Sequence, residues 1–265
     1  MIKIGWFTSA RDWAALELLK IVYKEIQRGF LPLNIAYVFV SKDKDESEWI
    51  REFIVEVEEK MKLPVVTFSA NKFEPTLRRD TLEKWRDLYH EEVLKRLPEE
   101  VKFGILAGYM WIVSSQFCKK IPLINLHPAL PGGPKGTWQE VIWQLISARA
   151  SETGIMMHQV TEELDEGPPL TYVRFPIRTQ DFIPLWDECE KLLLKYHLKG
   201  LKEKMGEKNP LFQKIREEGV KRELPFIVWT LKYLAEGEID FNNPDLPYNL
   251  TSEVEKYLKL NKFEG

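Results

Sequence analysis

Residues 1–40 read MIKIGWFTSARDWAALELLKIVYKEIQRGFLPLNIAYVFV and predict a strand, a helix and a second strand. Residues 2–7 form a short apolar run, and residues 34–40 are rich in β-branched and aromatic side chains. Between them, residues 12–29 repeat apolar side chains with the helical period, and Gly29 is a typical helix stop. This order predicts parallel strands joined by a helix that covers the sheet.

The same alternation continues along the chain. We expect helices at 46–62, 81–97 and 138–150, and strands at 64–68, 103–107, 123–126, 154–160 and 170–177. Residues 71–79 read as irregular, and a polar turn at 161–169 joins the last two strands. Beyond residue 180 the pattern is helical, with breaks near 206–210 and at Gly219. The expected fold is therefore α/β, a mostly parallel sheet with helices on both faces, in a domain of residues 1–180 that carries a packed helical extension of residues 181–265.

The composition limits the functions to be considered. The chain has 265 residues and a net charge of −3, so no global positive field favours nucleic acid or an anionic membrane. No apolar run reaches the roughly 18 residues of a membrane span, and the first residues do not resemble a signal peptide. Cys118 and Cys189 lack the spacing of metal ligands. We therefore expect a cytoplasmic protein without a metal or a membrane partner.

The most informative polar residues follow the strand at 123–126. His127 lies between this strand and a loop at 128–135 that is rich in proline and glycine. Asn125 precedes it by two residues, so both side chains leave the strand on the same face. An amide beside an imidazole could polarise a carbonyl and transfer a proton. The alternative is a structural histidine that caps the loop.

A carboxylate in the acidic turn could assist this histidine. Asp165 is one of four acidic residues within 162–166, a pattern that is usually only a solvated turn. Beside an imidazole it would raise the pKa of the ring and hold its tautomer. His158 begins the same strand–turn–strand unit and could contact Asp165, although it could equally be a satisfied strand histidine. His90 and His197 lie in charged helical stretches and are expected at the surface.

The loop between the first strand and the first helix is a weaker candidate. Its backbone N–H groups, at residues 8–12, could bind a phosphate at the start of the helix. The loop contains no glycine, which hinders the close approach of a phosphate. Neither a dinucleotide-binding glycine motif, nor a P-loop, nor a Gly-x-Ser-x-Gly elbow is present in the sequence.

Several motifs occur in an order that resembles a known family. They are Ala107-Gly108-Tyr109-Met110, Asn125-Leu126-His127-Pro128-Ala129-Leu130, Gly154-Ile155-Met156-Met157-His158 and Glu163-Leu164-Asp165-Glu166-Gly167-Pro168. This set is similar to the folate-dependent formyltransferases, which act on glycinamide ribonucleotide, methionyl-tRNA or amino sugars. The likeness is strongest over residues 103–177. It implies a Rossmann-like formyltransferase fold and 10-formyltetrahydrofolate as the formyl donor.

The resemblance also implies roles for individual residues. Asn125 would bind the formyl oxygen, His127 would stabilise the oxyanion and help the amine lose its proton, and Asp165 would orient His127. Formyl transfer would then pass through a tetrahedral intermediate. The cofactor-binding residues would be Leu106, Gly108, Met110, Ile112, Val113 and Glu163, although the stripe at 110–113 also suits ordinary core packing. The substrate-binding residues would be Thr8, Ser9, Ala10 and His158.

Three departures from the family leave the acceptor open. The first loop lacks the glycines that hold a substrate phosphate, Trp111 stands where arginine is common, and residues 129–134 replace the usual Ser-Leu-Leu-Pro. We expect a small amine, an amino sugar or a glycinamide ribonucleotide-like acceptor, and a homodimer is possible. A tRNA acceptor is disfavoured because residues 180–265 read as helical and not as a β-barrel. The alternatives are a catalytically idle folate- or nucleotide-binding relative and a 10-formyltetrahydrofolate hydrolase.

Overall fold

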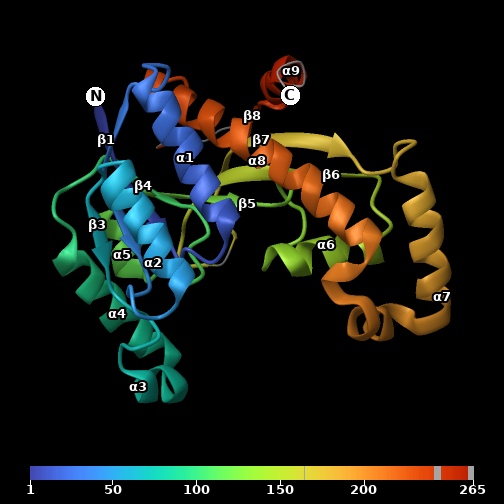
Figure 1. Ribbon diagram of the computed structural model, residues 1–265, viewed down its shortest axis with the longest axis horizontal. Coiled ribbons are helices and arrows are strands. Elements are labelled where there is room, and N and C mark those ends of the chain that lie inside the picture. Colours follow the sequence, from blue (N-terminus) through green and yellow to red (C-terminus); the bar gives the residue numbers. More distant parts are fainter. Residues whose placement is uncertain (164, 242–245, 262–265) are drawn as a thin grey trace.

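The computed structural model describes residues 1–163, 165–241 and 246–261. Within them, eight strands form one sheet in the order β3-β2-β1-β4-β5-β6-β7-β8 (Figure 1). Strands β1 to β5 are all parallel to one another, whereas β6 is antiparallel to both β5 and β7. The predicted mostly parallel α/β sheet is therefore confirmed. The strands are β1 (Ile2–Thr8), β2 (Leu33–Val40), β3 (Val65–Thr67), β4 (Phe103–Leu106), β5 (Leu123–His127), β6 (Glu152–Gln159), β7 (Pro169–Pro176) and β8 (Tyr248–Asn249).

Helices cover both faces of this sheet. The larger hydrophobic cluster contains side chains of α1, α2, α6 and α8, and the smaller cluster contains side chains of α4 and α5. None of the helices in the described part of the chain combines the length and apolar character needed to span a membrane. The helices are α1 (Trp13–Gln27), α2 (Glu48–Val55), α3 (Pro75–Asp80), α4 (Leu82–Arg96), α5 (Ser115–Lys120), α6 (Trp138–Ser147), α7 (Ile183–Met205), α8 (Pro210–Glu236) and α9 (Thr251–Asn261), with a π-helical turn at Glu56–Lys60 and a 3-10 turn at Gly206–Lys208.

The helices begin and end where local chemistry allows. Asp12 caps α1 by accepting a hydrogen bond from the Ala15 backbone N–H at 3.3 Å. At the other end, Gly29 adopts a φ of +73°, which a residue with a side chain rarely tolerates. Between these signals the apolar stripe of α1 packs onto the sheet. These local features explain why the first helix could be predicted within two residues.

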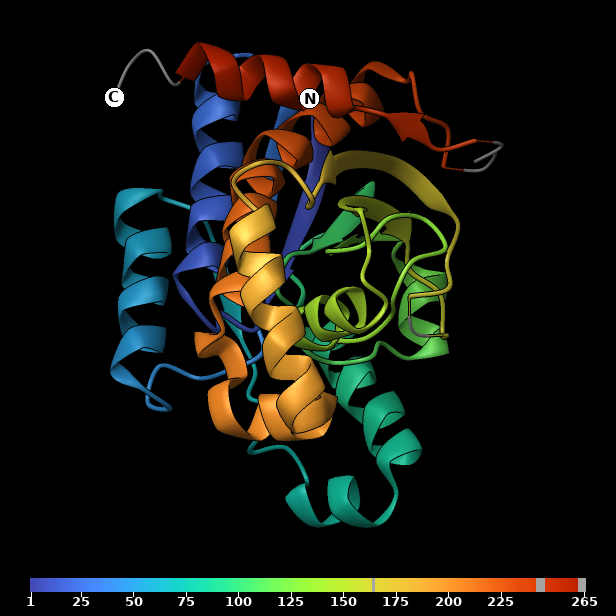
Figure 2. The same ribbon diagram turned by 90° about the vertical axis from the view of Figure 1, so that its right-hand side faces the viewer.

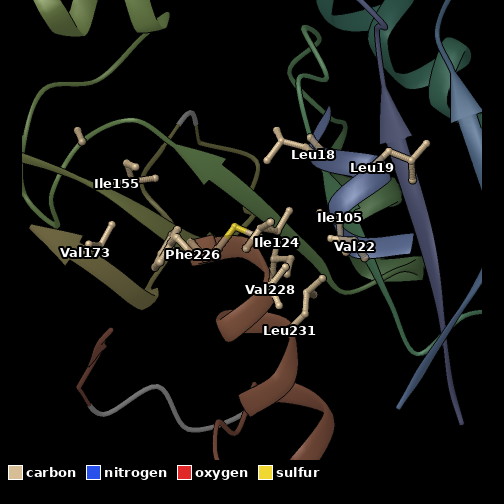
Figure 3. Packing of buried hydrophobic residues seen from close by; sticks show 14 of the residues in the cluster. Leu18, Leu19, Val22, Ile105, Ile124, Ile155, Val173, Phe226, Val228 and Leu231 are labelled. Carbon is tan, nitrogen blue, oxygen red and sulfur yellow. The ribbon is translucent and has the colours of Figure 1, made fainter. Parts of the chain in front are cut away.

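Helix α8 of the C-terminal extension belongs to the main core. It packs against α1, α6, β6 and β7, and Figure 2 shows α9 lying across one end of the molecule. Figure 3 shows Phe226, Val228 and Leu231 of α8 facing Ile124 of β5 and the buried side of α1. The extension therefore stabilises the sheet by burying apolar surface. The division into separate domains at residue 180 stays a prediction.

Two predictions about helices are wrong. Residues 71–79, expected to be irregular, contain the start of α3, which begins at Pro75 in a position where its missing N–H is not needed. The expected break at Gly219 is absent, because α8 continues through both Gly219 and Pro225. Buried side chains on either side of these residues hold α8 in place, so tertiary packing overrides the poor helix propensity of both. The break at 206–210 is confirmed.

The prediction that His90 lies at the surface is also wrong. His90 is fully buried on α4, where its Nδ1 donates a hydrogen bond to the Arg86 carbonyl oxygen and its Nε2 lies 3.2 Å from the Tyr109 hydroxyl. Burial lowers its pKa to about 4, so the ring is neutral. His197 is exposed as expected. Helix α5 and strand β8 are too short to produce a periodic pattern and were not predicted.

Truncation of one side chain tests whether α8 is part of the core. Leu231→Ala is expected to lower the free energy of unfolding by about 2–5 kcal/mol, because it leaves a cavity at a fully buried position. Leu194→Ala in α7 is the matched control, since that side chain is 78% exposed; its effect should stay within about 0.5 kcal/mol. Urea unfolding measures both variants. Equal stabilities would contradict the assignment.

Candidate active site

The candidate active site lies where β5 meets β6. Asn125 and His127 leave β5 on the same face, and Asn125 is directly opposite His158 in the antiparallel register. Asp165 belongs to the turn between β6 and β7, which folds back over this face. Its carboxylate oxygens lie 3.5 Å from His127 Nδ1 and 3.6 Å from His158 Nε2. The structure thus brings together the three predicted catalytic residues and His158, and it confirms the expected proximity of His158 and Asp165.

Hydrogen bonds fix the orientation of His158 and Asn125. His158 Nδ1 lies 2.8 Å from the Gln159 carbonyl oxygen, which can only accept, so this nitrogen carries the proton. His158 Nε2 is therefore an acceptor, and it receives a hydrogen bond from Asn125 Nδ2 at 3.1 Å. The Asn125 amide is thereby oriented and retains a second N–H for another partner.

The proline- and glycine-rich loop after β5 orients His127 and Asp165. His127 Nε2 donates a hydrogen bond to the Pro134 carbonyl oxygen at 2.8 Å, which leaves Nδ1 facing Asp165. The Gly136 backbone N–H donates to Asp165 Oδ2 at 3.2 Å. Gly136 adopts a φ of +104°, so glycine is required to present this N–H. An ion pair between Lys135 and Glu166 also joins the loop to the acidic turn.

The electrostatics favour a neutral imidazole beside an ionised carboxylate. Burial lowers the pKa of His127, and the contacts with Pro134 and Asp165 oppose this effect only in part. Burial alone would raise the pKa of Asp165. The adjacent His158 and His127 imidazoles and the hydrogen bond from the Gly136 N–H together lower it instead. Near neutral pH, His127 Nδ1 is therefore a free proton acceptor whose protonated form Asp165 would stabilise.

A pocket beside these residues contains four of the predicted cofactor-binding residues. Leu106, Ile112, Val113 and Glu163 line it together with Asn125, His158 and Asp165. Its apolar walls and polar end fit a flat heterocycle with polar edges. The volume is about 60 Å³, well below the roughly 300 Å³ of small ligand pockets. A ring of that kind would therefore require outward movement of the acidic turn, in which Leu164 lies outside the described residues.

The other two predicted cofactor-binding residues lie elsewhere. Gly108 and Met110 line a neighbouring cavity with Leu126 and Pro128. Tyr109 was not expected to line a pocket. It lines the pocket beside Asn125, and its hydroxyl contacts His90. A partly buried tyrosine just beyond a short apolar strand carries no pattern from which such a position could be predicted.

The predicted substrate-binding loop is closed within the protein. Thr8, Ser9 and Ala10 are all buried. The Ser9 N–H donates to the Gly108 carbonyl oxygen, and the Ala10 N–H donates to Thr8 Oγ1. The Ser9 hydroxyl contacts Ser41 and the Met110 N–H. A phosphate would have to compete with these hydrogen bonds. The substrate-binding role of the three residues therefore stays a prediction.

Comparison with known proteins identifies the family. A family model described as formyl transferase matches residues 19–183, more than half of the chain. The chain belongs to the formyl transferase family. This formyltransferase is 28% identical, over 59% of its length and 77% of the other protein, to phosphoribosylglycinamide formyltransferase of Dictyostelium discoideum. The predicted resemblance, and with it the transferase class of enzyme, is confirmed.

Other relatives match less of their own length. Formyltetrahydrofolate deformylase 1, mitochondrial, of Arabidopsis thaliana is 27% identical over 75% of this formyltransferase and 56% of its own chain. The phosphoribosylglycinamide formyltransferase of Saccharomyces cerevisiae is 34% identical over 36% of this chain and 48% of the yeast protein. The present chain therefore matches about half the length of that relative. The solved phosphoribosylglycinamide formyltransferase of Coxiella burnetii shares 18% identity at a TM-score of 0.63, covers 91% of both chains and supports the fold alone.

The protonation state of His127 can be measured directly. By NMR titration, its imidazole is expected to titrate below the ordinary pKa of 6.5, because burial opposes the charged form. Asp165→Asn should lower this pKa further, since it removes the negative charge that raises it. His197→Gln removes the exposed histidine and helps to assign the spectra. A higher pKa in Asp165→Asn would contradict the described electrostatics.

Proposed function

We propose that this formyltransferase transfers a formyl group from 10-formyltetrahydrofolate to an amine. The carboxylate of Asp165 between the His127 and His158 rings, beside Asn125, is the observation that carries the proposal. These groups supply a hydrogen-bond donor for a carbonyl oxygen and a neutral base for an amine. The names of the relatives support formyl transfer and a formylated folate as the donor.

The donor substrate supplies the formyl carbonyl, and the apolar pocket would hold its ring. Leu106, Ile112 and Val113 provide the walls, and Glu163 lies at the entrance side with the acidic turn. Gly108 and Met110 would take part only if the ring reached the neighbouring cavity. The described residues contain no group of three or more side chains suited to a metal ion, and the proposal requires none.

Each polar residue has a distinct task in the proposed reaction. The remaining N–H of Asn125 would donate to the formyl oxygen, and His158 holds the amide in that orientation. His127 Nδ1 would take the proton that the amine loses when it forms the new C–N bond. Asp165 would stabilise the resulting imidazolium, and the proton taken from the amine would then be passed from His127, by way of the Asp165 carboxylate, to the departing folate nitrogen, so that one proton is taken up and the same proton is released. Loss of one such oxyanion donor typically lowers the rate by about 10²- to 10³-fold.

The acceptor is open among a small amine, an amino sugar and a glycinamide ribonucleotide-like molecule. The names of several relatives favour the last, whereas the Ser9 and Ala10 N–H groups of the first loop already donate within the protein. Hydrolysis of the same donor is the second candidate, because the Arabidopsis deformylases match 75% of the chain. A cavity of about 840 Å³ beside α8 favours an acceptor larger than water. A cytoplasmic location, a homodimer and the absence of a nucleic-acid partner stay predictions.

Titration calorimetry with a stable 10-formyltetrahydrofolate analogue tests the donor site. Micromolar binding by the wild type is expected. His127→Ala and Asn125→Ala should keep the fold but lower formyl transfer by at least about 10²-fold. His197→Ala, on the exposed surface of α7, is the matched control and should be fully active. A folded protein that does not bind millimolar analogue would refute the donor assignment. Formate release that is independent of added amine would identify a hydrolase.

The pH dependence tests the role of His127 as a base. kcat/KM should be level near neutral pH and fall only below about pH 6.5, because the lowered pKa keeps the ring neutral down to that value. The midpoint of the acid limb should coincide with the NMR pKa of His127 in the free enzyme. If the acid limb of the kcat/KM profile had its midpoint at a clearly different pH, a group other than His127 would be the base.

A further inference from the structure

A groove lined largely by the C-terminal extension leads to the proposed active site. Three neighbouring cavities share Arg216 and Trp138, and the largest has a volume of about 840 Å³. They lie where α8 passes the first turn of α1 and the start of α6, an arrangement visible in Figure 1. The middle cavity reaches Pro128, the residue directly after His127. The groove therefore connects α8 with the strand end that carries the proposed base.

Arg216 is held rigidly at the junction of these cavities. Its guanidinium lies 4.6 Å from the centre of the Trp138 ring, and its Nη1 donates to Glu223 Oε1 at 2.8 Å. The Arg216 side chain is 23% exposed and that of Glu223 is 7% exposed. Burying an ion pair costs desolvation free energy, and apolar side chains could fill the same space without that cost. A stacked and anchored guanidinium keeps further N–H donors in a fixed plane, which suits recognition of a carboxylate or phosphate.

The charges around the groove leave positive groups available. Four acidic residues line the cavities: Glu223 pairs with Arg216, Glu217 pairs with Lys221, Asp12 caps α1, and Glu207 accepts a hydrogen bond from the Gln139 amide. In contrast, Arg11 and Lys208 line the cavities without an ion-pair partner among the residues that the structure describes. An anion in the groove would therefore meet more available cationic donors than competing carboxylates.

The opposite wall of the groove is apolar. Trp13 is 61% exposed at the start of α1, and it lines the largest cavity together with Phe212 and Val220. The exposed Trp13 ring provides a surface on which a planar or apolar group can pack, and the buried Phe212 supports the floor of the cavity. Both the apolar wall and the cationic groups thus face the same space.

We propose that the amine acceptor carries an anionic group, a carboxylate or a phosphate, which Arg216 binds while the body of the acceptor packs against Trp13. This inference rests on the proposed function and names the acceptor class. The Ser9 and Ala10 N–H groups of the first loop donate within the protein, so we assign recognition of the anion to α8. The amino group then points along the groove towards His127. Specificity for the acceptor is in this way built into the C-terminal extension.

Three matched amines test the proposal: 4-(aminomethyl)benzoate, 4-(aminomethyl)phenylphosphonate and the neutral 4-methylbenzylamine. Calorimetry should show that the wild type binds at least one acidic amine about 10- to 100-fold more tightly than the neutral amine, the range of a charge-assisted hydrogen bond. Comparison of the carboxylate with the phosphonate identifies the preferred anion. Arg216→Gln should remove the preference and leave binding of the neutral amine unchanged.

Two further variants guard against a folding defect. Arg216→Gln leaves Glu223 buried without its partner, so Arg216→Gln/Glu223→Gln is measured beside it, and Arg216→Lys should restore part of the preference. Arg222→Gln is the matched control, because Arg222 lies on α8 and pairs with Glu218 and Glu255 but lines none of the three cavities. Equal binding of all three amines, or a preference that persists in folded Arg216→Gln, would overturn the inference. Formyl transfer to the neutral amine alone would retain the proposed function and refute only the anionic acceptor.

Discussion

The buried carboxylate of Asp165 is the group on which the arrangement of the site depends. An ionised carboxylate is costly to bury unless several donors and positive partners surround it. Here the partners come from three separate segments: His127 at the end of β5, His158 on β6 and the Gly136 N–H in the loop before α6. Satisfying one carboxylate therefore fixes the acidic turn, the loop and both strands relative to one another.

The change of direction at β6 makes this arrangement possible. A strand parallel to β6 could follow it only through a crossover connection of about a dozen or more residues. The antiparallel register instead places His158 directly opposite Asn125 and lets a short turn return over the same face. The acidic turn can then reach His127 without a long crossover. The same turn lines the apolar pocket, so Asp165 belongs both to the contacts of His127 and to the wall of the pocket.

The C-terminal extension has two roles in the same helix. One face of α8 supplies buried side chains such as Phe226 and Leu231 to the core. Its N-terminal half carries Arg216 and Glu223, which border the groove next to α1 and α6. The position of the groove is therefore as rigid as the core.

Much of this protein could be predicted from its sequence, because the relevant signals are local. The alternation of strands and helices follows from periodicity, and the shared face of Asn125 and His127 follows from the pleat of a strand. Segments whose own signals are weak, such as α8 around Gly219 and Pro225, were misjudged because distant packing outweighs local propensity.

The remaining features depend on contacts between residues far apart in the chain, which only the tertiary structure decided. The burial of His90 requires Tyr109 above it, and the closure of the first loop requires Gly108 at the end of β4. The stacking of Arg216 on Trp138 joins two helices that carry no common motif. Sequence alone thus determined the order of the elements and the identity of the polar residues. Three-dimensional packing decided which donors are occupied, which charges are available and where an acceptor can enter, because burial and pairing are properties of a residue's surroundings.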